Sequence, residues 1–203
     1  MNGNLGFSGD LKTKHIMAGK GPGLTWKAKN YLRPKFLAGL LQALVAIPVA
    51  KMTGTLAATG RLEARLIRAN GEIVNYGLLS NHSVTNAFVN FLAAQLVTDT
   101  TEIGDFKFHD SGVGTTAENV TDTAMETTDG ESRATGNQTN PTSPTYRSVG
   151  TISYTTTKAI TEHGVFSQST GATLMDRSVF SAINVVNGDS IQFTYTLTLT
   201  AGG

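Results

Sequence analysis

The feature that most constrains the fold is a stretch of strict alternation near the C-terminus, residues 189–199. Every second position is apolar (Ile191, Phe193, Tyr195, Leu197 and Leu199), and the positions between carry Gln192, Thr194, Thr196 and Thr198. Successive side chains of a strand point to opposite faces, so this pattern predicts a half-buried antiparallel strand. At a sheet edge, an uncharged outer face of this kind would invite pairing with another chain. We therefore predict that the strand is central, or that it pairs with a partner subunit.

Other strand patterns accompany it. Residues 146–157, 159–167, 172–180 and 190–200 read as strands, and turn signals at 169–171 and 187–189 separate the later ones. Further upstream, alternation on both sides of Asn70-Gly71 predicts a hairpin at about 61–77 with a type I′ turn. Strands joined by short turns form an antiparallel meander. The chain is thus predicted to be mainly β: an antiparallel β-sandwich or barrel, with one or two short helices and an extended N-terminal arm.

Charge is distributed unevenly along the 203 residues. Residues 1–68 contain eleven Lys and Arg against two acidic residues, which gives +9, whereas residues 69–203 contain five against thirteen, which gives −8. A basic leader on an acidic body can engage an anionic partner or the acidic face of a neighbouring copy. The chain has no Cys, so disulfides, thiolate chemistry and Cys-based zinc sites are excluded.

Residues 1–35 are rich in Gly and basic residues and show little periodicity. We interpret them as an arm that becomes ordered only against a partner. Within the arm, residues 26–35 interleave aromatic and cationic side chains: Trp26, Lys27, Lys29, Tyr31, Arg33 and Lys35. Such a run can bind nucleic acid, with rings stacked on bases, or it can anchor the arm in a groove of a neighbouring subunit. Without a recognised nucleic-acid motif, protein docking is the favoured interpretation.

The most apolar run covers residues 36–50 and includes Phe36, Leu40 and Leu44. The repeat of Leu37, Leu40, Leu41, Leu44 and Val45 indicates a short helix that ends before Pro48. The run is shorter than a membrane span, and too many residues precede it for a signal peptide. Its apolar residues lie almost all round the helix, which disfavours an interfacial membrane helix and predicts burial in the core or between subunits.

Two parts are predicted: a leader of residues 1–60 and a β-rich body of residues 61–203. The body includes a helix at about 83–97, capped by Ser83, and a strand at 103–109. The polar stretch 115–145 is too long for an ordinary loop. It indicates a functional loop, a segment ordered by a partner, or a hairpin that extends from the body.

Patterns of catalytic chemistry are scarce. His15, His82, His109 and His163 lack metal-ligand spacing, and Glu162 and His163 are neighbours in a strand, so they point to opposite faces. Residues 112–116 contain two Gly but no Lys, which excludes a phosphate loop of the usual type, and no Gly-x-Ser-x-Gly elbow occurs. We predict that the protein is not an enzyme, with no catalytic residues, metal site or cofactor.

Several short motifs occur in a familiar order: residues 159–166, 171–180, 183–185 and 188–191, preceded by the helix at 84–97 and the stretch 106–115. They resemble the closing β-module of structural proteins from tailed bacteriophages, over about residues 61–200. The resemblance implies a virion component made in the host cytoplasm and located on the capsid surface. A capsid cement or decoration protein bound to the major capsid protein fits best, and a tail, fibre or head–tail adaptor protein with a binding loop at 115–145 is the alternative.

The hypothesis assigns two groups of residues. Partner binding is predicted for the arm, through Trp26, Lys27, Lys29, Tyr31, Arg33, Lys35, Phe36, Leu40 and Leu44. Glu162, Asp176 and Arg177 are candidates for pairs that fix strand register or join subunits, with solvated surface charge as the alternative. A homo-oligomer, most simply a trimer, is expected. Nucleic acid and membrane are not expected partners.

Overall fold

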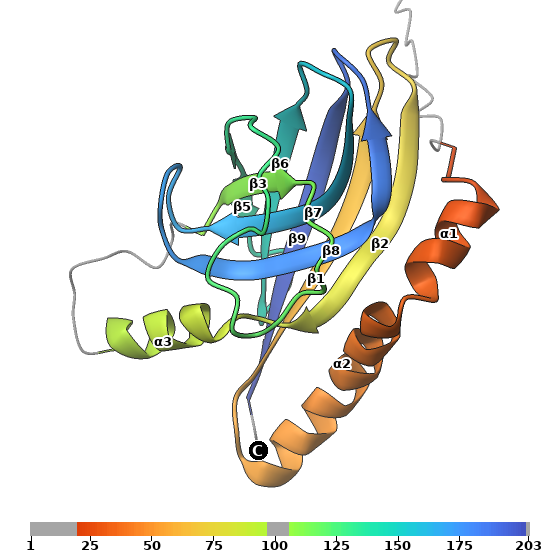
Figure 1. Ribbon diagram of the computed structural model, residues 1–203. Helices are drawn as coiled ribbons and strands as arrows, with labels where there is room; N and C mark the ends of the chain where they lie inside the picture. Colours follow the sequence, from red (N-terminus) through yellow and green to blue (C-terminus); the bar gives the residue numbers. More distant parts are fainter. Residues whose placement is uncertain (1–19, 97–105, 202–203) are drawn as a thin grey trace, which may run out of the picture.

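A computed structural model describes residues 20–96 and 106–201, apart from the side chains of Ala43 and Ile47. The chain is mainly β, with two antiparallel sheets face to face and three helices in the described residues (Figure 1). The sheets do not close into a barrel, so of the two predicted architectures the sandwich is confirmed.

The first sheet has the strand order β2-β1-β9-β6-β5 and the second the order β4-β3-β7-β8. The strands are β1 (Ala57–Ile67), β2 (Ile73–Ser83), β3 (Phe108–Gly112), β4 (Ala134–Thr135), β5 (Asn137–Thr139), β6 (Thr145–Ser153), β7 (Lys158–Phe166), β8 (Leu174–Val185) and β9 (Ser190–Thr200). The predicted simple meander is wrong, because β6 and β7 belong to different sheets. The chain crosses between the two layers at Tyr154, whose ring is buried there.

Strand β9 occupies the middle of the first sheet, between β1 and β6. Its apolar residues Ile191, Phe193 and Tyr195 are fully buried between the sheets, and its Thr side chains are half-buried on the outer face. The alternation therefore predicted both the strand and its central position. β9 needs no partner subunit to complete its pairing.

The β1–β2 hairpin is confirmed but is longer than predicted, and its turn is of another type. Only Gly71 has a positive φ, +85°, whereas a type I′ turn requires two such residues. The backbone N–H of Gly71 donates to the carbonyl of Arg68 (2.8 Å), and Arg68 N–H donates to Glu72 (2.8 Å). This is a type I turn followed by a left-handed Gly, the usual three-residue hairpin loop.

The described helices are α1 (Leu24–Tyr31), α2 (Pro34–Thr53) and α3 (Asn86–Gln95). Helix α3 is capped by Thr85, whose hydroxyl accepts from Phe88 N–H (3.2 Å), and not by Ser83 as predicted. The predicted strand at 103–109 is also misplaced, because β3 begins only at Phe108; residues 97–105 lie outside the described ones.

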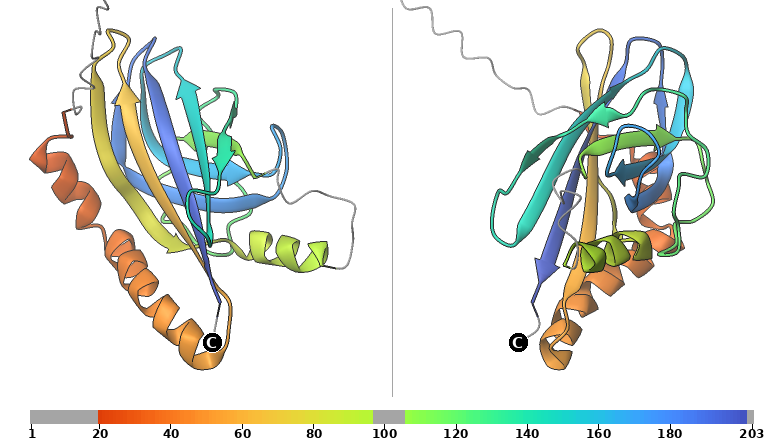
Figure 2. Two further views of the ribbon diagram at one scale, coloured as in Figure 1. Left: turned by 180° about the vertical axis from the view of Figure 1, so that it is seen from behind. Right: turned by 90° about the vertical axis from the view of Figure 1, so that its left-hand side faces the viewer.

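The prediction that the second helix ends before Pro48 is wrong. Helix α2 continues through Pro48, which removes one backbone hydrogen bond, and ends at Gly54 in the left-handed conformation (φ +68°). The helix runs along the outside of the β1–β2 hairpin, and its C-terminal part extends beyond the sheets (Figures 1 and 2). This 20-residue helix contains an 18-residue window with a mean hydropathy of 1.7, so it is long and apolar enough to cross a membrane, by length and composition alone.

Candidate functional site: the exposed apolar face of α2

Helix α1 is fastened to the chain's own body by its polar atoms. The indole N–H of Trp26 lies 3.1 Å from the carbonyl oxygen of Ser181 and 3.0 Å from that of Ala182. Asn30 is fully buried: its amide donates to the Leu79 carbonyl (3.3 Å) and its oxygen accepts from Ser181 N–H (3.1 Å). The prediction of an arm without a seat on the body is therefore wrong for residues 20–35. Residues 1–19 of that arm lie outside the described residues.

The predicted partner-binding residues divide into two groups. Four of them contact the body or each other: Trp26, Tyr31, Arg33 and Phe36. The Arg33 guanidinium donates to the Val179 carbonyl, the Trp26 ring contacts Tyr76 (4.6 Å between centroids), and Tyr31 contacts Phe36 (5.1 Å). The other five, Lys27, Lys29, Lys35, Leu40 and Leu44, are exposed. The aromatic residues thus hold the helices on the body, and only the second group is free to meet a partner.

Helix α2 faces the body mainly with small residues. Gly39 lies against β2 so closely that an added Cβ atom would be 2.4 Å from the Asn81 carbonyl oxygen. Ala50 is buried and Ala46 half-buried on the same side, and Phe36 is a large residue that is also buried there. Small side chains allow the helix and the strand to approach closely.

Seven large apolar residues of α2 are exposed, on the side of the helix away from the body. We call them the α2 ridge: Leu37 (48% exposed), Leu40 (36%), Leu41 (63%), Leu44 (67%), Val45 (48%), Val49 (46%) and Met52 (86%). Soluble monomers seldom expose a contiguous apolar surface of this kind unless it binds something. The predicted burial of this helix is not provided by the described part of the chain, and the ridge is therefore the candidate functional site.

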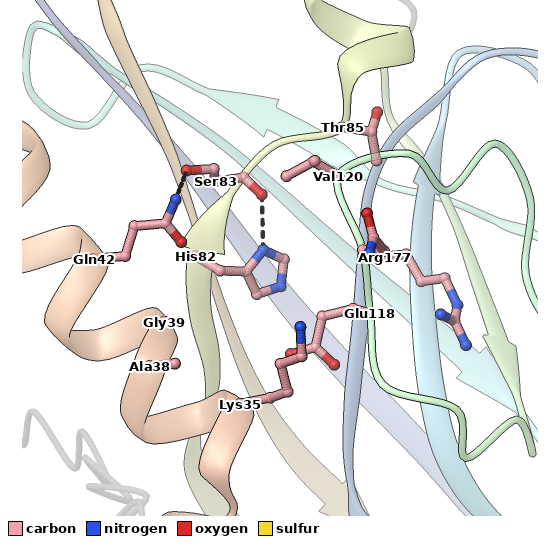
Figure 3. Close-up of a pocket in the computed structure, with 11 residues that line it drawn as sticks. Lys35, Ala38, Gly39, Gln42, His82, Ser83, Thr85, Glu118, Val120 and Arg177 are labelled. Atoms are coloured by element: carbon pink, nitrogen blue, oxygen red, sulfur yellow. Dashed lines mark hydrogen bonds between the residues drawn. The ribbon is translucent and has the colours of Figure 1, made fainter.

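A cavity of about 220 Å³ lies beside α2, between the helix, the end of β2 and residues 118–120 (Figure 3). Gln42 of α2 donates to the Ser83 hydroxyl (2.8 Å), which helps to fix the helix. Burial alone would lower the pKa of His82, but the Asp176 carboxylate 3.7 Å away raises it above its ordinary value. Glu118 forms a loose ion pair with Arg33 (3.8 Å), and its Oε2 has no hydrogen-bond partner.

The polar residues beneath this cavity do not form an activated nucleophile. Ser178 lies 3.3 Å from His82 Nε2, yet its side chain is buried and its hydroxyl donates to Asp176 (3.0 Å). Tyr195 also donates to Asp176 (3.2 Å). The Asp176 carboxylate is thus satisfied by hydroxyl groups, and burial raises its pKa. Within the described residues no three His, Asp or Glu side chains are grouped so that they could hold a metal ion.

Glu162 and Arg177, two of the register candidates, form a buried pair within the chain. The guanidinium donates to Glu162 (2.6 Å) and to Asp122 (2.9 Å). Glu162 is fully buried and also accepts from the backbone N–H groups of Gly114 (3.1 Å), Glu126 (2.6 Å) and Thr127 (3.3 Å). The pair therefore fastens residues 113–127 to the second sheet, and the alternative of solvated surface charge is wrong for both residues.

A second buried polar cluster, formed by His109, His163 and Ser148, lies between the sheets. The sequence pattern does not predict that these residues meet. His109 contacts His163 (2.9 Å between Nδ1 and Nε2) and the Ser148 hydroxyl (2.8 Å from Nε2). Burial lowers the pKa of His109 to about 4 and that of His163 well below its ordinary value. His163 thus points into the core while Glu162 points to the loop, which confirms that the two neighbours occupy opposite faces. The two histidines meet because β3 pairs with β7, which spacing along the chain does not reveal.

Comparison with known proteins does not assign the chain to a group. No family model, no curated protein and no solved structure matches it.

Proposed function

We propose that this chain is a structural virion protein of a tailed bacteriophage, a cement or decoration protein that binds the major capsid protein on the capsid surface and reinforces the shell. Its copies act together, most simply as trimers. The proposal draws on the resemblance of residues 61–200 to phage structural proteins. On the molecule itself it rests on one observation, the outward-facing α2 ridge.

Burial of the ridge supplies the energy of binding in this proposal. Transfer of a Leu side chain from water into an apolar site contributes about 1.5–3 kcal/mol, so a few ridge residues suffice for specific binding. Leu41 and Leu44 are each more than 60% exposed, so most of their surface remains to be buried by a partner.

Over residues 20–53, the proposed binding element is an ordered part of the body and not an arm that becomes ordered only on binding. We call the attachment of α1 and α2 to the body the mount. The hydrogen bonds of Trp26 and Asn30 hold α1 on the body, and Gly39 seats α2 against β2. A binding element that is already ordered loses less conformational entropy when the partner arrives. In this proposal the body holds the ridge in the orientation in which it contacts the shell.

Co-sedimentation with purified empty shells of the encoding phage tests the proposal. The variant L41S/L44S should bind at least about 100-fold more weakly, because two Leu side chains no longer contribute to burial. The control L32S/L96S makes the same changes at Leu32 (71% exposed) and Leu96 (90% exposed), outside the ridge, and should bind like the wild type. Equal binding by both variants would refute the role of the ridge.

The alternative is a tail, fibre or adaptor protein that binds a receptor or partner with residues 115–145. One observation favours it: the Glu162–Arg177 pair holds part of this stretch in place, and Thr115, Thr116, Thr121 and Thr123 are exposed there. Polar loops on a rigid β scaffold suit recognition. The copy number separates the two proposals, because a capsid protein is present in hundreds of copies per particle and a tail protein in far fewer.

A further inference from the structure

We infer that the α2 ridge binds in an apolar groove with acidic ends on a shell subunit, and not against a second copy of this chain. The inference rests on the proposed function and adds the chemistry of the partner surface.

The width of the ridge points to a groove. At 3.6 residues per turn, Leu37, Leu40, Leu41, Leu44, Val45, Val49 and Met52 spread over about half of the helix circumference. Two helices that pack side by side bury a narrower stripe. A surface with walls on both sides of the helix buries all seven residues, as in the helix-in-groove mode of recognition. The groove would be about 22 Å long, at 1.5 Å per residue from residue 37 to residue 52.

The charges at the two ends of the ridge indicate that the partner groove has acidic residues at its ends, which we call the acidic rim. Lys27, Lys29 and Lys35 are exposed near its N-terminal end, and Lys51 is exposed near its C-terminal end. The sequence has no acidic residue between Asp10 and Glu63. Two α2 helices in contact would therefore bring cations together in either orientation, with no carboxylate on the helices to compensate.

The described residues of a second copy offer few such carboxylates. Among the acidic residues of the described chain, only Glu72 and Glu126 are exposed, and the others are buried or half-buried. Many of them are already paired: Asp110 with Arg133, Glu131 with Lys158, Glu162 with Arg177, and Asp189 with Arg68. Within the described part of residues 69–203, the negative charge is thus largely paired or buried. Among the described residues, charge complementarity to the ridge ends therefore points to another protein.

The experiment compares two charge-reversed variants in co-sedimentation with purified empty shells, at low and at physiological salt. K35E/K51E reverses two exposed charges near the ends of the ridge; because Lys35 also lines the cavity beside Glu118, urea unfolding checks that the variant keeps wild-type stability. The matched control R61E/R65E makes the same change in net charge at Arg61 and Arg65, which are exposed on β1. We expect K35E/K51E to bind about tenfold more weakly at low salt, with a difference that shrinks as salt rises, and the control to stay within about twofold of the wild type.

The outcomes separate the inference from the proposed function. If the wild type binds shells and K35E/K51E binds equally well, the acidic rim is refuted while the cement function stands. If size-exclusion chromatography with light scattering shows oligomers of the wild type that L41S/L44S abolishes, the ridge is an interface between copies and the inference is overturned. If the wild type does not bind shells at all, the proposed function fails and the inference fails with it.

Discussion

Gly39 of α2 lies so close to β2 that a Cβ atom on it would be 2.4 Å from the carbonyl oxygen of Asn81. That distance is far below any ordinary contact, and the atom in the way belongs to the backbone. The position of α2, and with it the direction of the ridge, therefore depends on the absence of one side chain.

The variant G39V should displace α2 from the hairpin. We expect a loss of about 1–3 kcal/mol in the free energy of unfolding, since the helix must shift to admit the side chain. Urea unfolding measures the loss, and limited proteolysis within residues 34–53 reports the displacement. The neighbouring Ala38 is exposed, so A38V should change neither. If G39V is cleaved within residues 34–53 at the same rate as the wild type, the position of the helix does not depend on this close approach.

Trp26 allows a second test of how α1 is held on the body. It is the only Trp in the chain, so the intrinsic Trp fluorescence reports on this position alone. W26F keeps an aromatic ring against Tyr76 but removes the N–H that faces the carbonyls of Ser181 and Ala182. We expect a destabilisation of about 0.5–1.5 kcal/mol in urea unfolding, the usual net contribution of a hydrogen bond. In the wild-type chain, intrinsic fluorescence should report a partly buried indole without any partner. Emission typical of a fully hydrated indole would show that α1 is not seated in the free protein.

The buried Glu162–Arg177 pair makes the strongest stability prediction. E162Q leaves the buried Arg177 guanidinium without the carboxylate charge and turns an NH2 group towards N–H donors that Glu162 accepts from, so it should cost about 3–5 kcal/mol, the usual loss when a buried charge pair is broken. E63Q breaks the exposed Arg61–Glu63 pair (2.7 Å) and should cost less than about 1 kcal/mol. Chemical unfolding of the two variants under identical conditions gives the comparison. Similar losses for both would mean that burial does not strengthen the Glu162 contacts.

The histidines between the sheets predict how stability depends on pH. Burial lowers the pKa of His109 to about 4, whereas the unfolded chain has the ordinary value near 6.5. Between these values the unfolded state binds more protons, so stability falls as the pH falls from about 6.5 towards 4. His109 alone contributes a slope of up to about 1.4 kcal/mol per pH unit in that range.

The variant H109Q isolates this contribution. Its unfolding free energy should fall less steeply below pH 6.5 than that of the wild type, which urea unfolding at pH 4.5, 5.5 and 6.5 can measure. His82 acts in the opposite direction: because its folded pKa is raised, it adds stability at low pH that is lost as the pH rises through that pKa. His82 is present in both proteins, so the difference between their curves of unfolding free energy against pH comes from the loss of His109. Parallel curves would contradict the prediction.

Periodicity predicted the parts of this fold that depend on local pattern. The alternation of Ile191, Phe193 and Tyr195 was sufficient to predict both the strand and its central place, and the Asn70-Gly71 signal predicted the hairpin. The turn type was wrong because Asn70 keeps a negative φ and only Gly71 adopts the left-handed conformation. Pro48 misled the helix prediction, because loss of one hydrogen bond did not end a helix held on its other turns.

The candidate site could be predicted only in part. The sequence shows apolar residues all round α2, so the apolar pattern alone does not show which side the body covers. The spacing of Gly39, Ala46 and Ala50 could have indicated it, since a stripe of small residues marks the side of a close approach. The Glu162–Arg177 pair and the contact of His109 with His163 depend on which strands pair, and that is decided by the whole sheet.

The mount of α1 and α2 also affects how copies of this chain can meet. Strand β2 is an edge of the first sheet, and eleven residues of open edge would ordinarily template pairing with another molecule. Here Lys20 accepts from Asn75 N–H (2.9 Å), Asn30 binds the Leu79 carbonyl, and Gly39 covers the Asn81 carbonyl. Backbone pairing with another molecule is thereby obstructed along this edge strand, which leaves side-chain contacts, such as those of the ridge, as the way in which this face of the molecule can meet another protein.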